Sequence, residues 1–130
     1  MGVRVLLDTH VVLWALTEPD RLSNRSRELL EDAHTEIVVS AASAWEVATK
    51  HRLGKLPNAG DLVDSFAEYL RELRAVDLPI RTEHALLAGR LAVEHRDPFD
   101  RMLAAQALCE QIPLISQDAS FAAFPVSIVW

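Results

Sequence analysis

Four acidic residues carry the strongest chemical signal in this sequence. Asp8 directly follows a short apolar run, and Asp118 lies just beyond another. Glu46 lies about one helical turn past the end of a third apolar run, and Asp100 opens a helical segment. Carboxylates gathered at one place repel one another unless a cation compensates, and hard divalent cations prefer oxygen ligands. If these residues converge, we expect them to hold a divalent metal that assists hydrolysis of a phosphodiester bond.

The elements that would position these acids alternate along the chain. Apolar runs predict strands at 3–7, 36–40, 76–80, 113–116 and 126–129. Helical spacing or capping residues predict helices at 11–16, 25–34, 41–53, 61–73, 82–94 and 98–111. Strands that alternate with helices indicate an α/β fold, in which a parallel sheet of four to five strands is covered on both faces. The carboxyl ends of such strands meet at one edge, where we expect Asp8 and Asp118 to project.

Composition bounds the class of protein. The chain has 130 residues, half of them hydrophobic and a quarter charged, which predicts one globular domain over residues 1–130. The net charge of -6 argues against a domain that binds nucleic acid through a basic surface alone, but bound divalent cations would return positive charge. The single Cys109 excludes an internal disulfide and a multi-cysteine zinc site. Because the sequence shows neither a membrane span nor a signal peptide, we expect a cytoplasmic protein with no membrane partner.

The acids also fit structural roles as helix caps. Asp97 could be the N-cap of the helix whose first turn contains Asp100, where the helix dipole favours an acid. Ser43 and Glu46 have the spacing of a capping box. The same capping role is open to two further acids, Asp8 and Asp118. Spacing alone leaves open whether each acid binds metal or caps a helix.

Other polar residues near the same edge could assist the acids. The hydroxyl groups of Thr9 and Ser116 could bind a water molecule or orient a carboxylate, although helix capping fits them equally well. A basic cluster that follows Glu46 could contact a phosphate group or form a solvated face; it consists of Lys50, Arg52 and Lys55. The histidines lack metal-ligand spacing such as HExxH, so we expect surface or core positions for His10, His51, His84 and His95. Trp14 and Trp45 lie in apolar helical runs and are expected to pack.

Four segments, taken in order, resemble the successive motifs of PIN-domain nucleases. They are the segments at 6–10, 39–50, 95–107 and 115–118, of which the third reads HRDPFDRMLAAQA. Their order and spacing, and the length of the chain, are most similar to the VapC-type toxins of bacterial and archaeal toxin–antitoxin pairs. The likeness spans nearly the whole chain.

This resemblance implies a three-layer α/β/α PIN-like domain with Mg²⁺- or Mn²⁺-dependent endoribonuclease activity on RNA. It also implies a homodimer and a small VapB-like antitoxin that blocks the active site. The acids that match the family by position are Asp8, Glu46, Asp100 and Asp118, of which Asp8 and Asp100 match best as metal ligands. Asp97 belongs to the same local motif as Asp100 and could join the site.

The expected reaction is attack of a metal-activated water on phosphorus, which leaves a 5′-phosphate and a 3′-hydroxyl. Two other interpretations remain open at this point. One is a metal-dependent phosphohydrolase of a small molecule, although the sequence lacks a DxD pair and a glycine-rich phosphate loop. The other is a non-catalytic interaction module in which the acids only cap helices.

Overall fold

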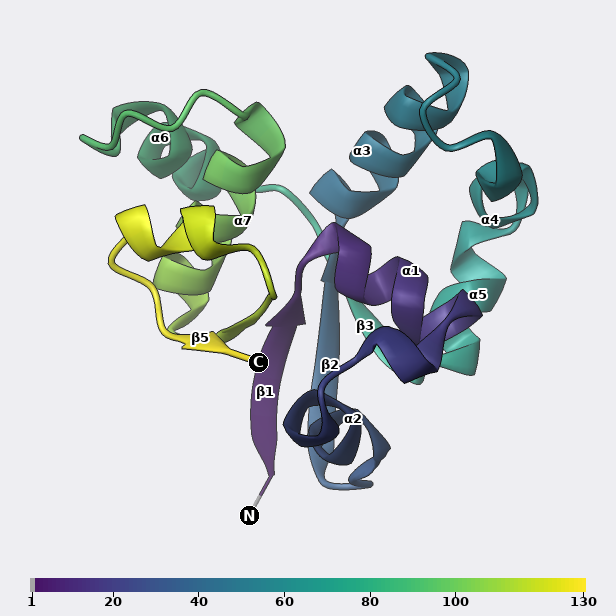
Figure 1. Cartoon of the computed structure of the whole chain (residues 1–130). Coiled ribbons are helices and arrows are strands. Elements are labelled where there is room, and N and C mark those ends of the chain that lie inside the picture. Colours follow the sequence, from purple (N-terminus) through teal and green to yellow (C-terminus); the bar gives the residue numbers. More distant parts are fainter. Residues whose placement is uncertain (1) are drawn as a thin grey trace.

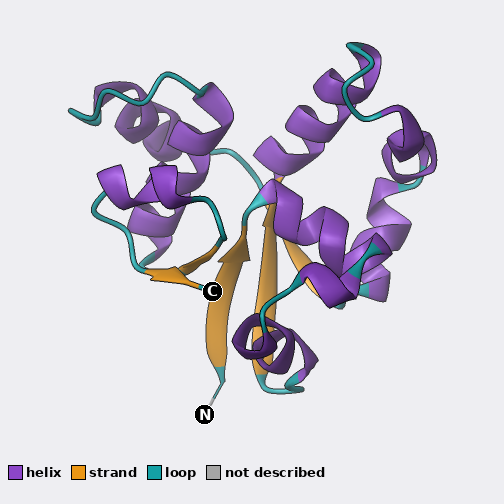
Figure 2. Cartoon of the chain, viewed as in Figure 1, coloured by secondary structure: helices purple, strands orange, loops and turns teal. Residues whose placement is uncertain are grey.

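The computed structural model describes residues 2–130, which form a central sheet with helices on both faces (Figures 1 and 2). The strands are β1 (Val3–Leu7), β2 (Thr35–Ser40), β3 (Ala75–Leu78), β4 (Leu114–Ile115) and β5 (Ile128–Val129). Their order across the sheet is β3-β2-β1-β4-β5, and each neighbouring pair is parallel. The structure therefore confirms the predicted α/β fold with three layers.

Helices connect the strands as a parallel sheet requires. They are α1 (Thr9–Thr17), α2 (Asn24–Glu31), α3 (Ala41–Arg52), α4 (Gly60–Asp64), α5 (Phe66–Glu72), α6 (Thr82–Arg90) and α7 (Pro98–Glu110). Short 3₁₀ turns form η1 (Pro19–Arg21), η2 (Pro57–Ala59) and η3 (Ala119–Ala123). Within residues 2–130, none of these helices has the length and apolar character needed to cross a membrane.

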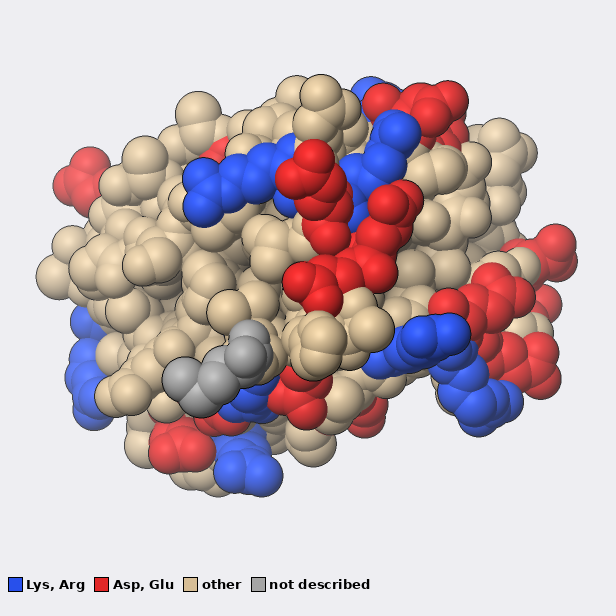
Figure 3. Space-filling view, turned by 90° about the horizontal axis from the view of Figure 1, so that it is seen from below, with Lys and Arg blue, Asp and Glu red and all other residues tan. Residues whose placement is uncertain are grey.

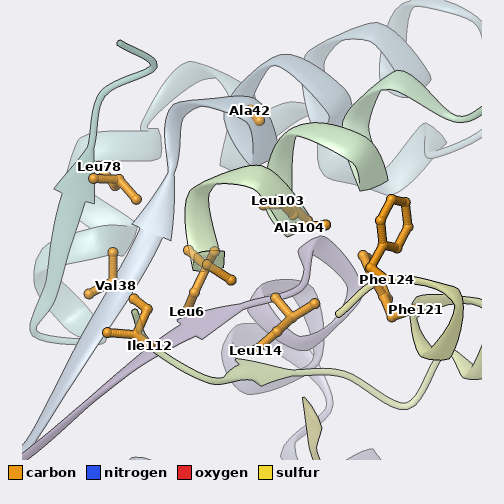
Figure 4. Packing of buried hydrophobic residues seen from close by; sticks show 11 residues of the cluster. Leu6, Val38, Ala42, Leu78, Leu103, Ala104, Ile112, Leu114, Phe121 and Phe124 are labelled. Carbon is orange, nitrogen blue, oxygen red and sulfur yellow. The ribbon is translucent and has the colours of Figure 1, made fainter. Parts of the chain in front are cut away.

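Alternating side chains of the central strands supply two separate hydrophobic cores. On one face, Leu6 and Leu114 lie under Leu103 and Ala104 of α7, with Phe121 of η3 beside them (Figure 4). On the other face, the core joins strand residues to α1 and to Leu22; its buried members are Val5, Leu7, Val11, Val12, Leu22, Ile37, Val39 and Ile115. Because both faces are covered, the carboxyl-terminal parts of β1 and β2 are buried and mostly apolar, whereas charged residues occur only near their exposed amino ends.

Two predicted helices differ from the structure. The helix expected at 82–94 ends at Arg90, and Thr82 is its first residue rather than its cap. Leu91 has a non-helical ψ of 123°, and Leu91 and Val93 pack against the core from an irregular segment. The helix expected from Asp61 is divided into α4 and α5 at Ser65, whose φ of -127° is not helical. In both places the regularly spaced apolar side chains pack inward although the backbone is not one continuous helix.

Charged residues of both signs are interspersed on the face at the amino ends of the strands. Figure 3 shows blue and red side chains next to one another there, with no continuous basic surface. One example is the ion pair between Arg4 on β1 and Glu36 on β2. This face therefore offers no obvious electrostatic attraction for nucleic acid.

Candidate active site

The opposite edge, at the carboxyl ends of the strands, is where the predicted acids lie. The register pairs Leu6 with Val38 and Leu7 with Ile115, so Asp8 follows β1 at the level where β2 and β4 end. The backbone N–H of Asp8 donates to the carbonyl oxygen of Ile115 (3.0 Å), which fixes this residue beside β4. From here α3 brings Glu46, and α7 brings Asp100.

Asp8 is a buried carboxylate at the N-cap position of α1. Its side chain makes no capping hydrogen bond to the helix, so capping does not account for this carboxylate. The residue is only 5% exposed, and the Ser116 hydroxyl donates to its Oδ2 (2.8 Å). Burial raises the pKa of Asp8; the Ser116 hydrogen bond and the charge of His10 oppose this rise, while the charge of Glu46 adds to it. Ionisation of Asp8 in the folded protein therefore costs free energy.

Glu46 is buried on α3 with one carboxylate oxygen unsatisfied. The capping box with Ser43 is wrong, because α3 begins at Ala41 and its N-cap is Ser40, whose side chain accepts from the N–H of Ala42 (2.9 Å). Glu46 is 3% exposed, and its Oε2 forms an ion pair with Lys50. Its Oε1 is buried and has no hydrogen-bond partner. A buried carboxylate oxygen without a partner is costly unless a cation or water reaches it.

Asp97 and Asp100 lie at the start of α7 and play different roles. Asp97 Oδ1 accepts hydrogen bonds from the N–H groups of Phe99 (2.9 Å) and Asp100 (3.3 Å), so the predicted N-cap is confirmed. Asp100 Oδ2 instead lies 2.9 Å from Nε2 of His95. Burial raises the pKa of Asp100 to about 6 against the effect of His95, with further contributions from nearby acids: Asp97, Asp8 and Glu46. These acids therefore share one electrostatic environment.

Asp118 lies at the rim of this group and caps the turn that follows it. It is exposed, and its Oδ1 accepts from the N–H of Ser120 (2.9 Å) at the start of η3. This hydrogen bond lowers the pKa of Asp118, and the charges of His95 and His10 also lower it. The capping alternative is confirmed for Asp118, which nevertheless remains near two histidines of the same edge.

The central acids lie near one another without touching. Each has a protein donor of its own: Ser116 for Asp8, Lys50 for Glu46 and His95 for Asp100. Across residues 2–130, the one group of three potential metal-ligand atoms within 4.8 Å of one another is at a different place, and it consists of Glu83, His84 and Glu110. Each carboxylate of the candidate site is thus hydrogen-bonded to a different residue.

The group around His84 does not have the protonation state of a metal site. Nδ1 of His84 accepts the N–H of Arg81 (3.0 Å), so the ring proton is on Nε2. That nitrogen lies 3.4 Å from Glu110 Oε2, to which it donates. His84 is completely buried, which confirms the core position expected for it.

Of the polar and basic residues expected to assist the acids, some contact the acids and the others do not. Ser116 donates to Asp8, which fits the carboxylate-orienting role among those left open, and its Oγ also accepts the N–H of Asp118 (3.0 Å). Thr9 instead forms a buried hydrogen bond with Ser43 (2.9 Å), which joins α1 to α3. In the basic cluster, Lys50 reaches Glu46, whereas two residues are exposed beyond it, Arg52 and Lys55.

Sequence reasoning missed two contributors to this edge. His95 was expected on the surface or in the core, yet it contacts Asp100 and lies 5.2 Å, between ring centroids, from Phe124. Trp45 was expected to pack, but it is 53% exposed, with its ring 4.6 Å from that of Phe99. The buried face of α3 contains Ala42, Ser43, Glu46 and Val47, so Trp45 points away from the core. Trp14 does pack as expected, beside Trp130.

A cleft of about 610 Å³ is lined by residues of α1 and by the segment that follows α3. His10, whose charge acts on Asp8 and Asp118, is at one end of its lining. The lining is mainly apolar and includes Trp14 and Tyr69, and it contains none of the four predicted acids. The acids therefore do not line this cleft.

Comparisons with known proteins agree with this architecture. Ribonuclease VapC16 of Mycobacterium tuberculosis is 38% identical over 69 residues, which cover 53% of this chain and 48% of that protein. The matched part thus spans about half the length of this relative. Ribonuclease VapC22 of the same organism is 28% identical over 114 residues, which cover 88% of this chain and 86% of the relative.

Solved structures share the fold. A chain in the crystal structure of VapBC2 from Rickettsia felis, bound to a DNA fragment from their promoter, superposes with a TM-score of 0.71 at 17% identity and 98% coverage of both chains. FitAcB from Neisseria gonorrhoeae gives a TM-score of 0.57 at 21% identity and covers 97% of this chain and 96% of that one. The family model for the PIN domain matches residues 5–126. Because that match includes nearly the whole sequence, this chain belongs to the PIN domain family.

Proposed function

We propose that this chain is a metal-dependent endoribonuclease that acts as the toxin of a toxin–antitoxin pair. Its membership of the PIN domain family supports this function, as do its relatives, which are named ribonucleases. The single observation that carries the catalytic proposal is the unsatisfied Oε1 of buried Glu46 beside the buried carboxylate of Asp8. Caps alone do not explain these two acids, so the proposal favours an enzyme over a non-catalytic module.

The donor set fits Mg²⁺ or Mn²⁺. Asp8, Glu46 and Asp100 would hold the ion, since carboxylate oxygens are the ligands that these hard cations prefer. Asp118 could join them, although its Oδ1 is already used by the cap of η3. When bound, the metal would lower the pKa of a water molecule and stabilise negative charge on the phosphate.

The residues around the acids have defined tasks in this proposal. Ser116 donates to Asp8 and so fixes the orientation of that carboxylate. Lys50 contacts Glu46, which places a positive charge next to the site where a backbone phosphate of RNA would lie. The exposed side chains of Arg52 and Lys55 extend this positive charge along the substrate. Asp97 assists indirectly, because its cap sets the start of the helix that carries Asp100.

The partners follow from the same proposal. We expect a small VapB-like antitoxin to block access to the acids, and we expect the toxin to be a homodimer. The VapBC2 and FitAcB structures, which share the fold of this chain, support this expectation. RNA substrates are met in the cytoplasm, which agrees with the localisation expected from the sequence.

The ends of the cleaved RNA test the reaction. Attack by water leaves a 5′-phosphate and a 3′-hydroxyl, whereas attack by the 2′-hydroxyl leaves a 2′,3′-cyclic phosphate. Mapping the ends with a ligase that requires a 5′-phosphate distinguishes these products. Turnover of a generic phosphomonoester with RNA left intact would instead favour the small-molecule phosphohydrolase.

A further inference from the structure

The segment at 91–97, between α6 and α7, has almost no backbone hydrogen bonds of its own. It joins two helices that pack side by side (Figure 1), and its internal backbone bond runs from the N–H of Val93 to the carbonyl oxygen of Leu91 (2.9 Å). Yet this segment carries His95, which contacts Asp100, and Asp97, which caps α7. Something other than secondary structure must hold it in place.

The guanidinium group of Arg101 binds four backbone carbonyl groups along this stretch. Its Nε donates to the carbonyl oxygen of Ala88 (2.9 Å), and its Nη2 donates to that of Leu91 (2.7 Å). Its Nη1 donates to the carbonyl oxygens of Val93 (2.8 Å) and His95 (3.0 Å). Four of the five guanidinium N–H groups are thereby used. Arg101 thus satisfies both the carbonyl end of α6 and the segment that follows it.

The position of Arg101 is unusual for a cation. It lies near the start of α7, where the helix dipole disfavours positive charge. Within residues 2–130 no carboxylate forms an ion pair with it. The carbonyl oxygens therefore supply the negative partner, and a planar group with five donors suits this task better than any other side chain.

We infer that Arg101 is a positioning residue of the acidic site. Arg101 binds the backbone carbonyl group of His95 and thereby holds the His95 ring against Asp100. Asp100 and Arg101 are neighbours in the first turn of α7. The segment and the acid are thereby tied to one rigid helix. This inference deepens the proposed function, but the contact between His95 and Asp100 that it explains exists without metal or substrate.

The first test uses the unaltered protein in EDTA. If the guanidinium group binds four carbonyl groups, rotation about its Cζ–N bonds is blocked, and NMR should resolve separate signals for the Nη protons of Arg101. A single averaged signal, as a freely rotating guanidinium gives, would overturn the inference. This measurement needs neither a variant nor activity.

The second test compares Arg101→Lys with Arg90→Lys, a matched control at an exposed arginine in the last turn of α6. Lysine keeps the charge but cannot bind four carbonyl groups in one plane. In Arg101→Lys, the His95 imidazole signals should move toward those of Asp100→Asn, in which the acceptor charge is removed. In Arg90→Lys they should stay at their original positions. If the His95 imidazole signals of Arg101→Lys are the same as those of the wild-type protein, the inference is overturned. If Arg101→Lys does not fold, the same comparison is made with Arg101→Gln.

Metal binding provides a readout that a purely structural role would not change. Disturbing a group that orients a metal ligand typically weakens metal affinity about 10-fold or more. We expect that loss in the Mn²⁺ dissociation constant of Arg101→Lys, measured by calorimetry well below its melting temperature, and none in Arg90→Lys. If the wild-type protein binds no Mn²⁺, the proposed function fails, while the NMR tests of Arg101 still stand by themselves.

Discussion

Replacing Asp100 with Asn should stabilise the metal-free protein at neutral pH. Burial is the main reason that the pKa of Asp100 rises from 3.8 to about 6, and the charges of Asp97, Asp8 and Glu46 add to it despite the opposing contact with His95. Above that pH the folded protein holds an ionised carboxylate that it would bind more favourably as the neutral acid. Asn has nearly the same shape and never ionises, so the variant avoids this cost.

The magnitude follows from linkage between protonation and folding. A rise in pKa from 3.8 to about 6 corresponds to at most about 3 kcal/mol. The Asp100 side chain is 14% exposed, so solvent screens part of this effect and we expect about 1–2 kcal/mol. For a chain of 130 residues this is an increase of about 4–8 °C in melting temperature.

The sign depends on pH in a defined way. Because the pKa is raised in the folded state, the folded protein binds more protons than the unfolded chain between about pH 4 and about pH 6. The wild-type protein therefore has the full stability of protonated Asp100 at the acidic end of this interval and loses it as the pH rises. The advantage of Asp100→Asn should be near zero at the acidic end and complete above the interval.

Thermal unfolding followed by circular dichroism in EDTA, across this pH interval, measures the effect. Asp64→Asn is the matched control, because Asp64 is exposed and lies outside the site. Addition of Mn²⁺ at 100 times its dissociation constant should then stabilise the wild-type protein by about 3 kcal/mol, and it should stabilise Asp100→Asn less. A variant that is less stable than wild type in EDTA at neutral pH would refute the reasoning, as would a pH-independent difference.

Substitutions at three further positions test Asp118 and the residues that contact the other acids. Ser116→Ala removes the hydrogen bond that lowers the pKa of Asp8, so the acidic limb of the profile of kcat/KM against pH should move to higher pH. Asp118→Ala should cost about 1 kcal/mol in urea unfolding through loss of its cap, whereas Asp118→Asn should keep both the cap and most of the RNA cleavage. Lys50→Met should destabilise the metal-free protein by about 1–3 kcal/mol, because it leaves Glu46 buried without its cation, and Mn²⁺ should restore part of that loss. An acidic limb that does not move in Ser116→Ala would contradict the role of Ser116 toward Asp8. Loss of RNA cleavage in Asp118→Asn would contradict a capping role for Asp118, and unchanged stability in Lys50→Met would contradict the role of Lys50 toward Glu46.

The sequence was sufficient to predict the elements and the edge of the sheet at which the acids lie. Apolar runs that end in polar residues located β1, β2 and β4, and alternation with helices required a parallel sheet. That topology places Asp8 next to Ser116, although 108 positions separate them in the chain. These predictions succeed because the apolar runs and their alternation with helical segments are local features of the sequence that the folded structure keeps.

Contacts between side chains and distant backbone groups could not be predicted in this way. The apolar spacing of Leu91 and Val93 fits a helix, but their carbonyl groups bind Arg101 and their side chains reach the core from an irregular segment. Likewise, the sequence left open whether each acid caps a helix or faces the site. The structure separates them, because the answer depends on where each helix begins: α3 begins too early for Glu46 to cap it, whereas α7 begins directly after Asp97.

The most direct test of the central claim is cleavage of a cellular RNA pool by the purified protein in Mg²⁺, in Mn²⁺ and in EDTA, beside Asp8→Asn. A metal-dependent nuclease centred on Asp8 should make discrete cuts with either metal, and none in EDTA or with the variant. Asp64→Asn, carried through the same purification, should cut as the wild-type protein does and so excludes a contaminating nuclease as the cause of any loss. Cuts that persist in EDTA, or that Asp8→Asn makes as well as the wild-type protein, would contradict a metal-dependent nuclease centred on Asp8.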